Sequence, residues 1–224
     1  MNRKTIPMKH PRRTAATIFA ALLVATGVPH AATGGIDDAA ADFSSSANPQ
    51  GPWRYGWMPR DGGTFTLAGQ YPTSGGIDRY EGGGQSFVGH NGTRRHQSFG
   101  TGSWPPGLLA LHPGREGEVA VVRWTAARTG TVIVDARYTR RDPVYPTTTD
   151  VRVRRRGVDV FSAELDGQRS QARFRSLVSV SEGDTLDFAV GWGRNRNYHG
   201  DTTGLALRIR WVESPADEPS VYPR

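Results

Sequence analysis

The sequence of 224 residues contains no cysteine. This absence excludes disulfide bonds, thiolate metal sites and a cysteine nucleophile. It also excludes a lipoprotein signal, which needs a cysteine to carry the acyl chain. A chain of this length can bury a hydrophobic core without cross-links, so the lack of cysteine is compatible with export from the cell.

Lysine is nearly absent, because none follows Lys9 and every later cationic side chain is an arginine. The sequence has 28 Lys plus Arg and 21 Asp plus Glu, but five of the basic residues precede residue 33, where no acidic residue occurs. The remainder carries a net charge of about +2, which argues against nucleic-acid binding. The arginines reflect either base composition or a surface whose planar guanidinium groups bind carboxylate or sulfate.

Familiar catalytic and metal-binding motifs are also missing. There is no Gly-x-Ser-x-Gly elbow and no phosphate-cradling glycine loop. His90, His96, His112 and His199 show no paired metal-ligand spacing, and His112 has the setting of a turn residue. We therefore expect binding rather than catalysis. A hydrolase with two dispersed carboxylates stays an alternative, because such a pair leaves no sequence signature.

The amino terminus has the three parts of a secretory signal. Residues 3–13 are basic, residues 15–25 are apolar, and small residues follow up to Ala32. An apolar run of 11 residues is shorter than the ~20 that a membrane-spanning helix needs. We predict a signal peptide over 1–32, a secreted or periplasmic protein, and no transmembrane anchor after cleavage.

The rest of the sequence alternates between strand and turn patterns and lacks sustained helical periodicity. We predict a linker over 33–42, one all-β domain over 43–212 and a flexible polar tail over 213–224. About ten strands at regular spacing indicate an antiparallel β-sandwich of jelly-roll or galactose-binding-like build. Residues 70–106 are interrupted by glycine and proline and favour an irregular excursion with one or two short strands.

Several segments follow one another in an order that resembles a known domain. They are residues 48–57, 109–114, 120–126, 148–151, 183–191 and 201–205. Together they resemble a β-sandwich domain of exported bacterial proteins, which is similar in build to galactose-binding-like sandwiches and carbohydrate-binding modules. The resemblance implies ligand binding rather than catalysis.

Two loops late in the sequence carry the candidate binding residues. The first, residues 192–201, combines aromatic, arginine and amide side chains between strong strands, as a polyhydroxylated ligand requires. The second, residues 142–148, is expected to face it. The candidates are Trp192, Arg194, Asn195, Asn197, Tyr198, His199 and Tyr145. The alternative interpretation is a solvated turn in which asparagines occupy positive-φ positions.

A metal site has weaker support. Asp150, Asp187 and Asp201 lie near strand ends and could supply oxygen ligands to a structural calcium ion. No dense run of alternating aspartates occurs, so the calcium-free interpretation is favoured and no cofactor is expected.

The aromatic residues allow two interpretations. Trp53, Tyr55 and Trp57 alternate along one strand and form either a sugar-binding platform or part of the core, and we expect at least two of them in the core. Trp124 and Trp211 are also expected in the core.

These features favour a secreted, non-catalytic binding domain for a saccharide or cell-envelope glycan. A structural or adhesion module that binds another envelope protein is the alternative.

Overall fold

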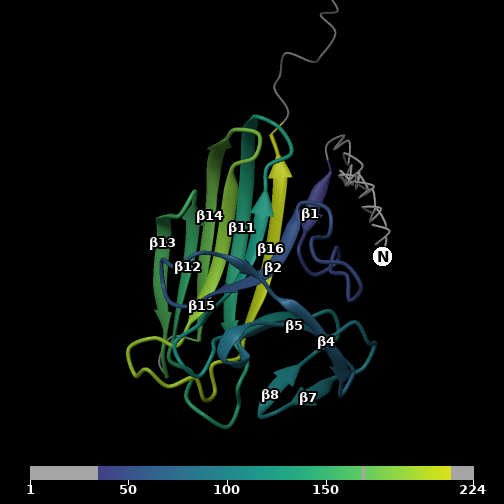
Figure 1. Cartoon of the computed structure of the whole chain (residues 1–224), viewed down its shortest axis with the longest axis vertical. Coiled ribbons are helices and arrows are strands. Elements are labelled where there is room, and N and C mark those ends of the chain that lie inside the picture. Colours follow the sequence, from purple (N-terminus) through teal and green to yellow (C-terminus); the bar gives the residue numbers. More distant parts are fainter. Residues whose placement is uncertain (1–34, 168–169, 213–224) are drawn as a thin grey trace, which may run out of the picture.

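The computed structural model describes residues 35–167 and 170–212, which form two antiparallel β-sheets packed face to face (Figure 1). The predicted signal peptide and polar tail lie outside these residues. No helix among the described residues has the length and apolar character needed to cross a membrane. The elements are β1(Ile36–Asp38), β2(Trp53–Met58), β3(Thr66–Leu67), β4(Gly69–Ser74), β5(Ile77–Glu81), the short 3-10 helix η1(Gly83–Gln85), β6(Phe87–His90), β7(Gln97–Phe99), β8(Gly102–Trp104), β9(Leu109–His112), β10(Val119–Thr125), β11(Gly130–Arg140), β12(Thr149–Arg155), β13(Val158–Leu165), β14(Gln171–Val180), β15(Thr185–Gly191) and β16(Thr203–Trp211).

The strand order confirms the predicted antiparallel sandwich. We call the larger sheet sheet A, and its order is β14-β11-β16-β9-β6-β5-β4, with β1 paired to β16. Sheet B has the order β13-β12-β15-β10-β2-β3, and β7 and β8 form a separate hairpin. In Figure 1 the long strands β14, β11 and β16 run side by side, whereas β4 and β5 cross the lower part of the molecule.

The core lies between the two sheets because alternate side chains of each strand point inward. Strand β11 buries Val132, Val134, Ala136 and Tyr138 in this way. Trp124 and Trp211 meet in the core with their ring centroids 5.9 Å apart, as expected.

The aromatic strand β2 contributes two of its three rings to the core. Trp53 and Tyr55 are fully buried. Trp57, further along the same face, is half-buried and packs against this core, and a Cβ atom added at Gly82 or Gly83 would come within 3.0 Å of its ring. The absence of side chains at these glycines therefore lets the backbone lie flat against the indole.

The predicted linker over 33–42 is wrong for most of its length. Residues 36–38 form β1 and pair with 208–210 of β16. Ala39 is buried in the core, and the carboxylate of Asp42 accepts a 3.0 Å hydrogen bond from the indole nitrogen of Trp53. A segment rich in alanine, glycine and aspartate has the composition of a linker, but here it covers the indole nitrogens of core tryptophans.

The irregular region also contains more structure than its sequence predicts. Strands β4 to β8 all lie between residues 69 and 104, where one or two strands were expected. Trp104, placed among turn residues in the sequence, is fully buried in a second core cluster with Ile77, Phe87, Leu108 and Ala110. Short strands bounded by glycines show little periodicity in the sequence. Strands β4, β5 and β6 join sheet A through the pairing of β6 with β9, which is a tertiary effect.

Candidate functional site

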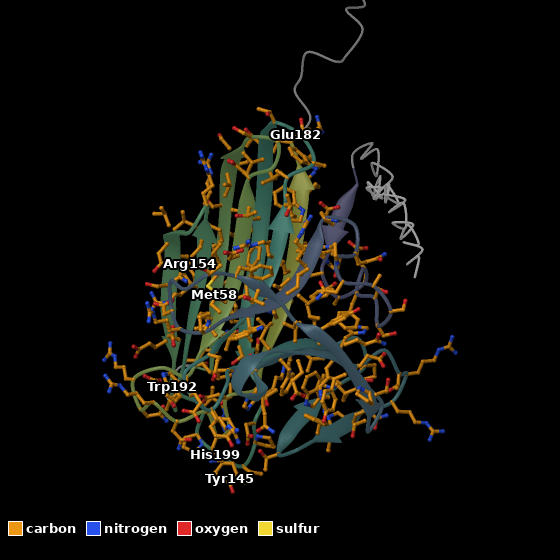
Figure 2. All side chains as sticks on the ribbon, viewed as in Figure 1. Met58, Tyr145, Arg154, Glu182, Trp192 and His199 are labelled. Carbon is orange, nitrogen blue, oxygen red and sulfur yellow. The ribbon has the colours of Figure 1, made fainter. Side chains whose placement is uncertain are left out.

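The loops over 142–148 and 192–201 meet at one end of the sandwich, which we call the loop end. Thr147 Oγ1 donates a 2.8 Å hydrogen bond to the carbonyl of Gly200. The backbone N–H of Thr148 donates to the Asp201 carboxylate at 3.0 Å. These bonds hold the two loops as one unit, and Figure 2 shows Tyr145 and His199 together at this end.

A small cavity of about 140 Å³ opens between the loops. Tyr145, Tyr198 and His199 form its rim, and Tyr145 is 49% exposed. Gly200 has a φ of 80°, and a Cβ atom there would lie 2.6 Å from Cβ of Tyr145. Only glycine satisfies both the left-handed backbone and this close approach, so Gly200 positions the tyrosine. The remaining lining residues are Phe87, Phe99, Gly100, Thr101, His112, Asp142 and Thr202.

His112 forms the floor of the cavity as a neutral imidazole. Its ring stacks on Phe87 with centroids 5.2 Å apart and meets the edge of Tyr198 at 5.8 Å. Burial lowers the pKa of His112 to about 4, although the hydrogen bond to the Pro113 carbonyl opposes this. Nδ1 is 2.7 Å from that carbonyl and acts as the donor, so Nε2 keeps a lone pair that can accept a hydrogen bond.

Asp142 organises the wall of the cavity. One carboxylate oxygen accepts the backbone N–H groups of Val144 and Tyr145, both at 2.8 Å, and the other accepts the hydroxyl of Thr101. Burial alone would raise the pKa of Asp142, but these hydrogen bonds outweigh it and lower the pKa. Both oxygens are therefore engaged within the protein, one by the loop itself and the other by Thr101.

Three of the seven predicted candidates, Tyr145, Tyr198 and His199, line the cavity, and the other four do not. Trp192 lies away from the rim in Figure 2, against Gly117, where an added Cβ atom would be 2.8 Å from its ring. Arg194 pairs with Glu164 at 2.6 Å.

Asn195 and Asn197 stabilise the turn instead of facing the cavity. Each side-chain carbonyl accepts a 3.0 Å hydrogen bond from the backbone N–H two residues later, at Asn197 and His199 respectively. Such bonds are the usual role of asparagine in turns. Besides Gly193 and Gly200, the residue of this loop with a positive φ is Arg196, at 52°, rather than an asparagine.

Sequence reasoning missed the residues that complete the cavity from other strands. Phe87, Phe99 and Thr101 come from the irregular region, and His112, which we interpreted as a turn residue, ends β9 and faces Tyr198. No local pattern marks them. Phe87 and His112, for example, reach the loop end through the pairing of β6 with β9 and of β9 with β16.

The structure does not gather the three aspartates proposed for calcium. The Asp187 carboxylate binds Arg123 through two hydrogen bonds of 2.6 and 2.8 Å. Asp150 accepts from Arg152 and from the backbone of Gly193. Among the described residues no group of three His, Asp or Glu side chains is placed to hold a metal ion.

Asp201 differs from the other two because it is fully buried. Burial raises its pKa to about 7, and the hydrogen bond from Thr148 offsets only part of this effect. Its Oδ2 atom has no hydrogen-bond partner, and neither does Oγ1 of Thr148. Asp201 is therefore a protonatable group inside the frame that joins the two loops.

Arg152 and Arg154 alternate with Val151 and Val153, a pattern that predicts a solvated outer face, but this face is covered. Arg154 is only 4% exposed, and it binds Asp159 and Asp61. Asp61 belongs to the segment between β2 and β3, which folds over the outer surface of sheet B. Alternation correctly places these side chains on the outer face but does not reveal that another segment covers it.

Comparisons with known proteins give no family. No family model and no curated protein matches the sequence. Matching solved structures include pika GITRL, CBM51 from Clostridium perfringens GH95 in complex with methyl-galactose, and a family 35 carbohydrate binding module from Clostridium thermocellum.

These similarities are low throughout. The identities are 13%, 11% and 12%, and the TM-scores are 0.30, 0.35 and 0.31. The matches cover 42%, 63% and 59% of this chain and 74%, 91% and 90% of the matched chains. At these TM-scores the description of the fold rests on the strand pairing of the chain itself.

Proposed function

We propose that this chain is a secreted, non-catalytic domain that binds a saccharide at the loop end. The observation that carries the proposal is the rim of Tyr145, Tyr198 and His199 around a cavity on a hydrogen-bonded frame. Aromatic rings at such a rim can pack against the apolar C–H face of a sugar. A cavity of about 140 Å³ is smaller than the ~300 Å³ at which drug-sized pockets begin, which fits one terminal sugar unit rather than a long chain.

The polar groups of the cavity match the hydroxyl groups of a sugar. The neutral His112 offers Nε2 as an acceptor, and the hydroxyls of Tyr145, Tyr198 and Thr202 can donate or accept. These groups stand on a scaffold of paired strands, which keeps them in place before the ligand arrives and so lowers the ordering cost of binding.

The carboxylates near the loop end support binding rather than hydrolysis. Glycoside hydrolysis needs two carboxyl groups on either side of the scissile bond. Within the described residues the cavity is lined by one carboxylate, Asp142, whose two oxygens are already engaged by its own loop and Thr101. Asp201 is buried behind the loops, where a substrate does not reach it.

Glycan-array binding followed by affinity electrophoresis of the purified chain tests the proposal. We expect retention by at least one saccharide and a loss of about fivefold or more in Tyr198→Ala, because stacking on an aromatic ring is worth on the order of 1 kcal/mol or more. Val144→Ala is the matched control, since this exposed loop residue does not line the cavity. Unchanged retention in both Tyr198→Ala and Tyr145→Ala would remove the loop end as the site.

A protein partner is the second candidate function. The edge strands β13 and β14 carry exposed apolar side chains, with Val158 68% exposed and Leu177 66% exposed. Apolar side chains on unpaired edges are typical of surfaces that associate with other chains. This reading predicts association through those strands and no affinity for saccharides.

A further inference from the structure

A groove on the outer face of sheet A lies away from the loop-end rim. Its volume is about 830 Å³. Gly204 and Ala206 of β16 lie in it where that strand leaves β9 and has not yet met β1. Arg137, Arg141 and Arg173 line it from β11, the residue after β11, and β14.

The outer face around this groove is rich in arginine. In the strand register Arg137 lies opposite Ala206 and Arg173, and Asp135 lies opposite Arg208 and Arg175. The face carries six arginines and two aspartates among the described residues, namely Arg137, Arg141, Arg173, Arg175, Arg208, Arg210, Asp38 and Asp135.

Both aspartates are already paired. Asp135 binds Arg173 through two hydrogen bonds of 3.0 and 2.6 Å, and Asp38 binds Arg208 at 2.8 Å. Arg137 and Arg141 form no ion pair with a described residue. The groove therefore holds guanidinium groups that are not matched by carboxylates of the chain.

The placement of these two arginines is unfavourable for the isolated chain. Arg137 stands directly opposite Arg173, and like charges in such a cross-strand pair are destabilising. Arg141 is half-buried, with its Nε atom 2.7 Å from where a Cβ atom of Gly204 would be, and that Nε has no hydrogen-bond partner. Burial and the charge of Arg137 together lower the pKa of Arg141. Such unfavourable placements of charged side chains are expected at a binding site, where the bound ligand compensates for their cost.

We propose that the groove binds the carboxylate groups of an acidic polysaccharide, with Arg137 and Arg141 as the residues that contact them. The saccharide nature of this ligand rests on the proposed function, whereas its negative charge follows from the groove alone. On this face Arg173 already binds the carboxylate of Asp135 through two hydrogen bonds, which is the geometry that a guanidinium group offers to a carboxylate ligand.

The groove is unsuited to nucleic acid. Single-stranded nucleic acids stack their bases on aromatic side chains. No Phe, Tyr or Trp lines this groove in the part of the chain that the structure describes, and Pro105 and Pro106 form one wall. The nearly neutral charge of the chain after residue 32 also lacks the excess that phosphate backbones attract.

Affinity electrophoresis and calorimetry with polygalacturonate test the inference. We expect the purified chain to bind polygalacturonate, to bind its fully methyl-esterified, neutral form at least tenfold more weakly, and to lose affinity as NaCl rises from 0.05 to 0.5 M. Arg137→Ala and Arg141→Met should each weaken binding about tenfold or more, because each removes a charge-assisted hydrogen bond. The methionine keeps an apolar stem over Gly204, and circular dichroism establishes that both variants fold.

Matched controls separate this groove from general charge and from the loop end. Arg175→Ala and Arg210→Ala remove exposed arginines of the same face that do not line the groove, and should bind polygalacturonate within about twofold of the unchanged chain. Tyr198→Ala should keep polygalacturonate binding in the groove.

Each contrary outcome has a distinct meaning. Equal binding of the charged and esterified polymers, or Arg137→Ala and Arg141→Met behaving like the control variants, would overturn the inference and leave the proposed function standing. Binding of heparin or single-stranded DNA as tightly as polygalacturonate would overturn the carboxylate assignment. Failure to bind any saccharide, neutral or acidic, would overturn both the inference and the proposed function.

Discussion

Asp201 carries a buried carboxyl group within the frame that joins the two loops at the loop end. Its Oδ1 atom accepts the N–H of Thr148, while Oδ2 has no partner. A buried carboxylate without full hydrogen bonding is costly, whereas the protonated acid is not. The raised pKa of about 7 is therefore a property of the loop frame, and it couples the stability of that frame to pH.

The pH dependence of folding tests this assignment. A raised folded pKa makes the contribution of Asp201 most favourable below the unfolded value of 3.8, and it is lost as pH rises toward about 7. Asp201→Asn resembles the protonated acid. We expect it to match the unchanged chain at pH 4 and to exceed it by about 4 kcal/mol in unfolding free energy at pH 8, measured by urea denaturation.

Asp142 serves as a control, because its pKa is shifted in the opposite direction to that of Asp201. Its pKa is lowered, so its stabilising contribution is present above 3.8 and disappears as pH falls below that value. Asp142→Asn should therefore be less stable than the unchanged chain at pH 7 and approach it at low pH. A constant difference between Asp201→Asn and the unchanged chain across pH 4 to 8 would contradict the assignment for Asp201.

At the scale of elements, the segment between β2 and β3 determines what the outer face of sheet B can do. Phe65 lies over this face, where Arg123 stacks on its ring at 4.0 Å. Asp61 reaches Arg154 on β12. The segment therefore covers part of the outer face of sheet B, and a groove of about 720 Å³ remains on that sheet beside Asp150, Arg152 and Glu164.

The close packing of this segment depends on Gly56. A Cβ atom there would come within 3.0 Å of the Thr66 carbonyl and the Phe65 ring. We expect Gly56→Ala to lower the unfolding free energy by about 1–3 kcal/mol, because the backbone or the ring must shift. Gly69→Ala is the control, since the nearest atom to its Cβ, the Glu81 carbonyl oxygen, is 4.0 Å away, and its change should stay within about 0.5 kcal/mol. Equal losses in the two variants by urea denaturation would show that the approach of Phe65 does not matter.

Elements with strict alternation were predictable from the sequence, whereas elements defined by their partners were not. Residues 131–138 alternate cleanly, and β11 follows this pattern. Strand β1 has three residues and exists because β16 offers an edge and Trp124 needs an acceptor, which Asp37 provides at 2.8 Å. Neither cause is visible in the local sequence.

At the loop end, too, one part of the structure was predictable from the sequence and another part was not. The sequence indicated that residues 142–148 face residues 192–201, and Tyr145, Tyr198 and His199 lie together as that predicts. Composition did not separate side chains that face the cavity from those that build the turn, as Asn195 and Asn197 do. The distinction depends on backbone hydrogen bonds within the loop, which composition does not encode.

At the scale of the whole molecule, one side of the sandwich presents an unpaired edge strand from each sheet. Strands β13 and β14 are the terminal strands of sheets B and A, and the rings of Phe161 and Phe174 meet between them at 5.6 Å. The nearly neutral charge after residue 32 provides little repulsion between copies or partners.

Association through this side is measurable by analytical ultracentrifugation and pull-down. If the chain has a protein partner, Val158→Lys and Leu177→Lys should abolish the association, because a charge on an exposed edge opposes strand pairing. Val144→Lys changes an equally exposed valine at the loop end and should leave it intact. A monomer at 100 µM that captures no protein would remove this candidate function.

The pairing of β1 with β16 has a consequence for how the domain is presented. Ile36 lies opposite Arg210, so the first and last described strands leave the sandwich at the same end. Strand β16 begins at Thr203 beside the loop end and runs to Trp211, a span of roughly 25 Å. A fluorescent tag or a solid support joined directly before Ile36 or directly after Trp211 would therefore lie at the end of the sandwich opposite Tyr145 and His199 (Figure 2).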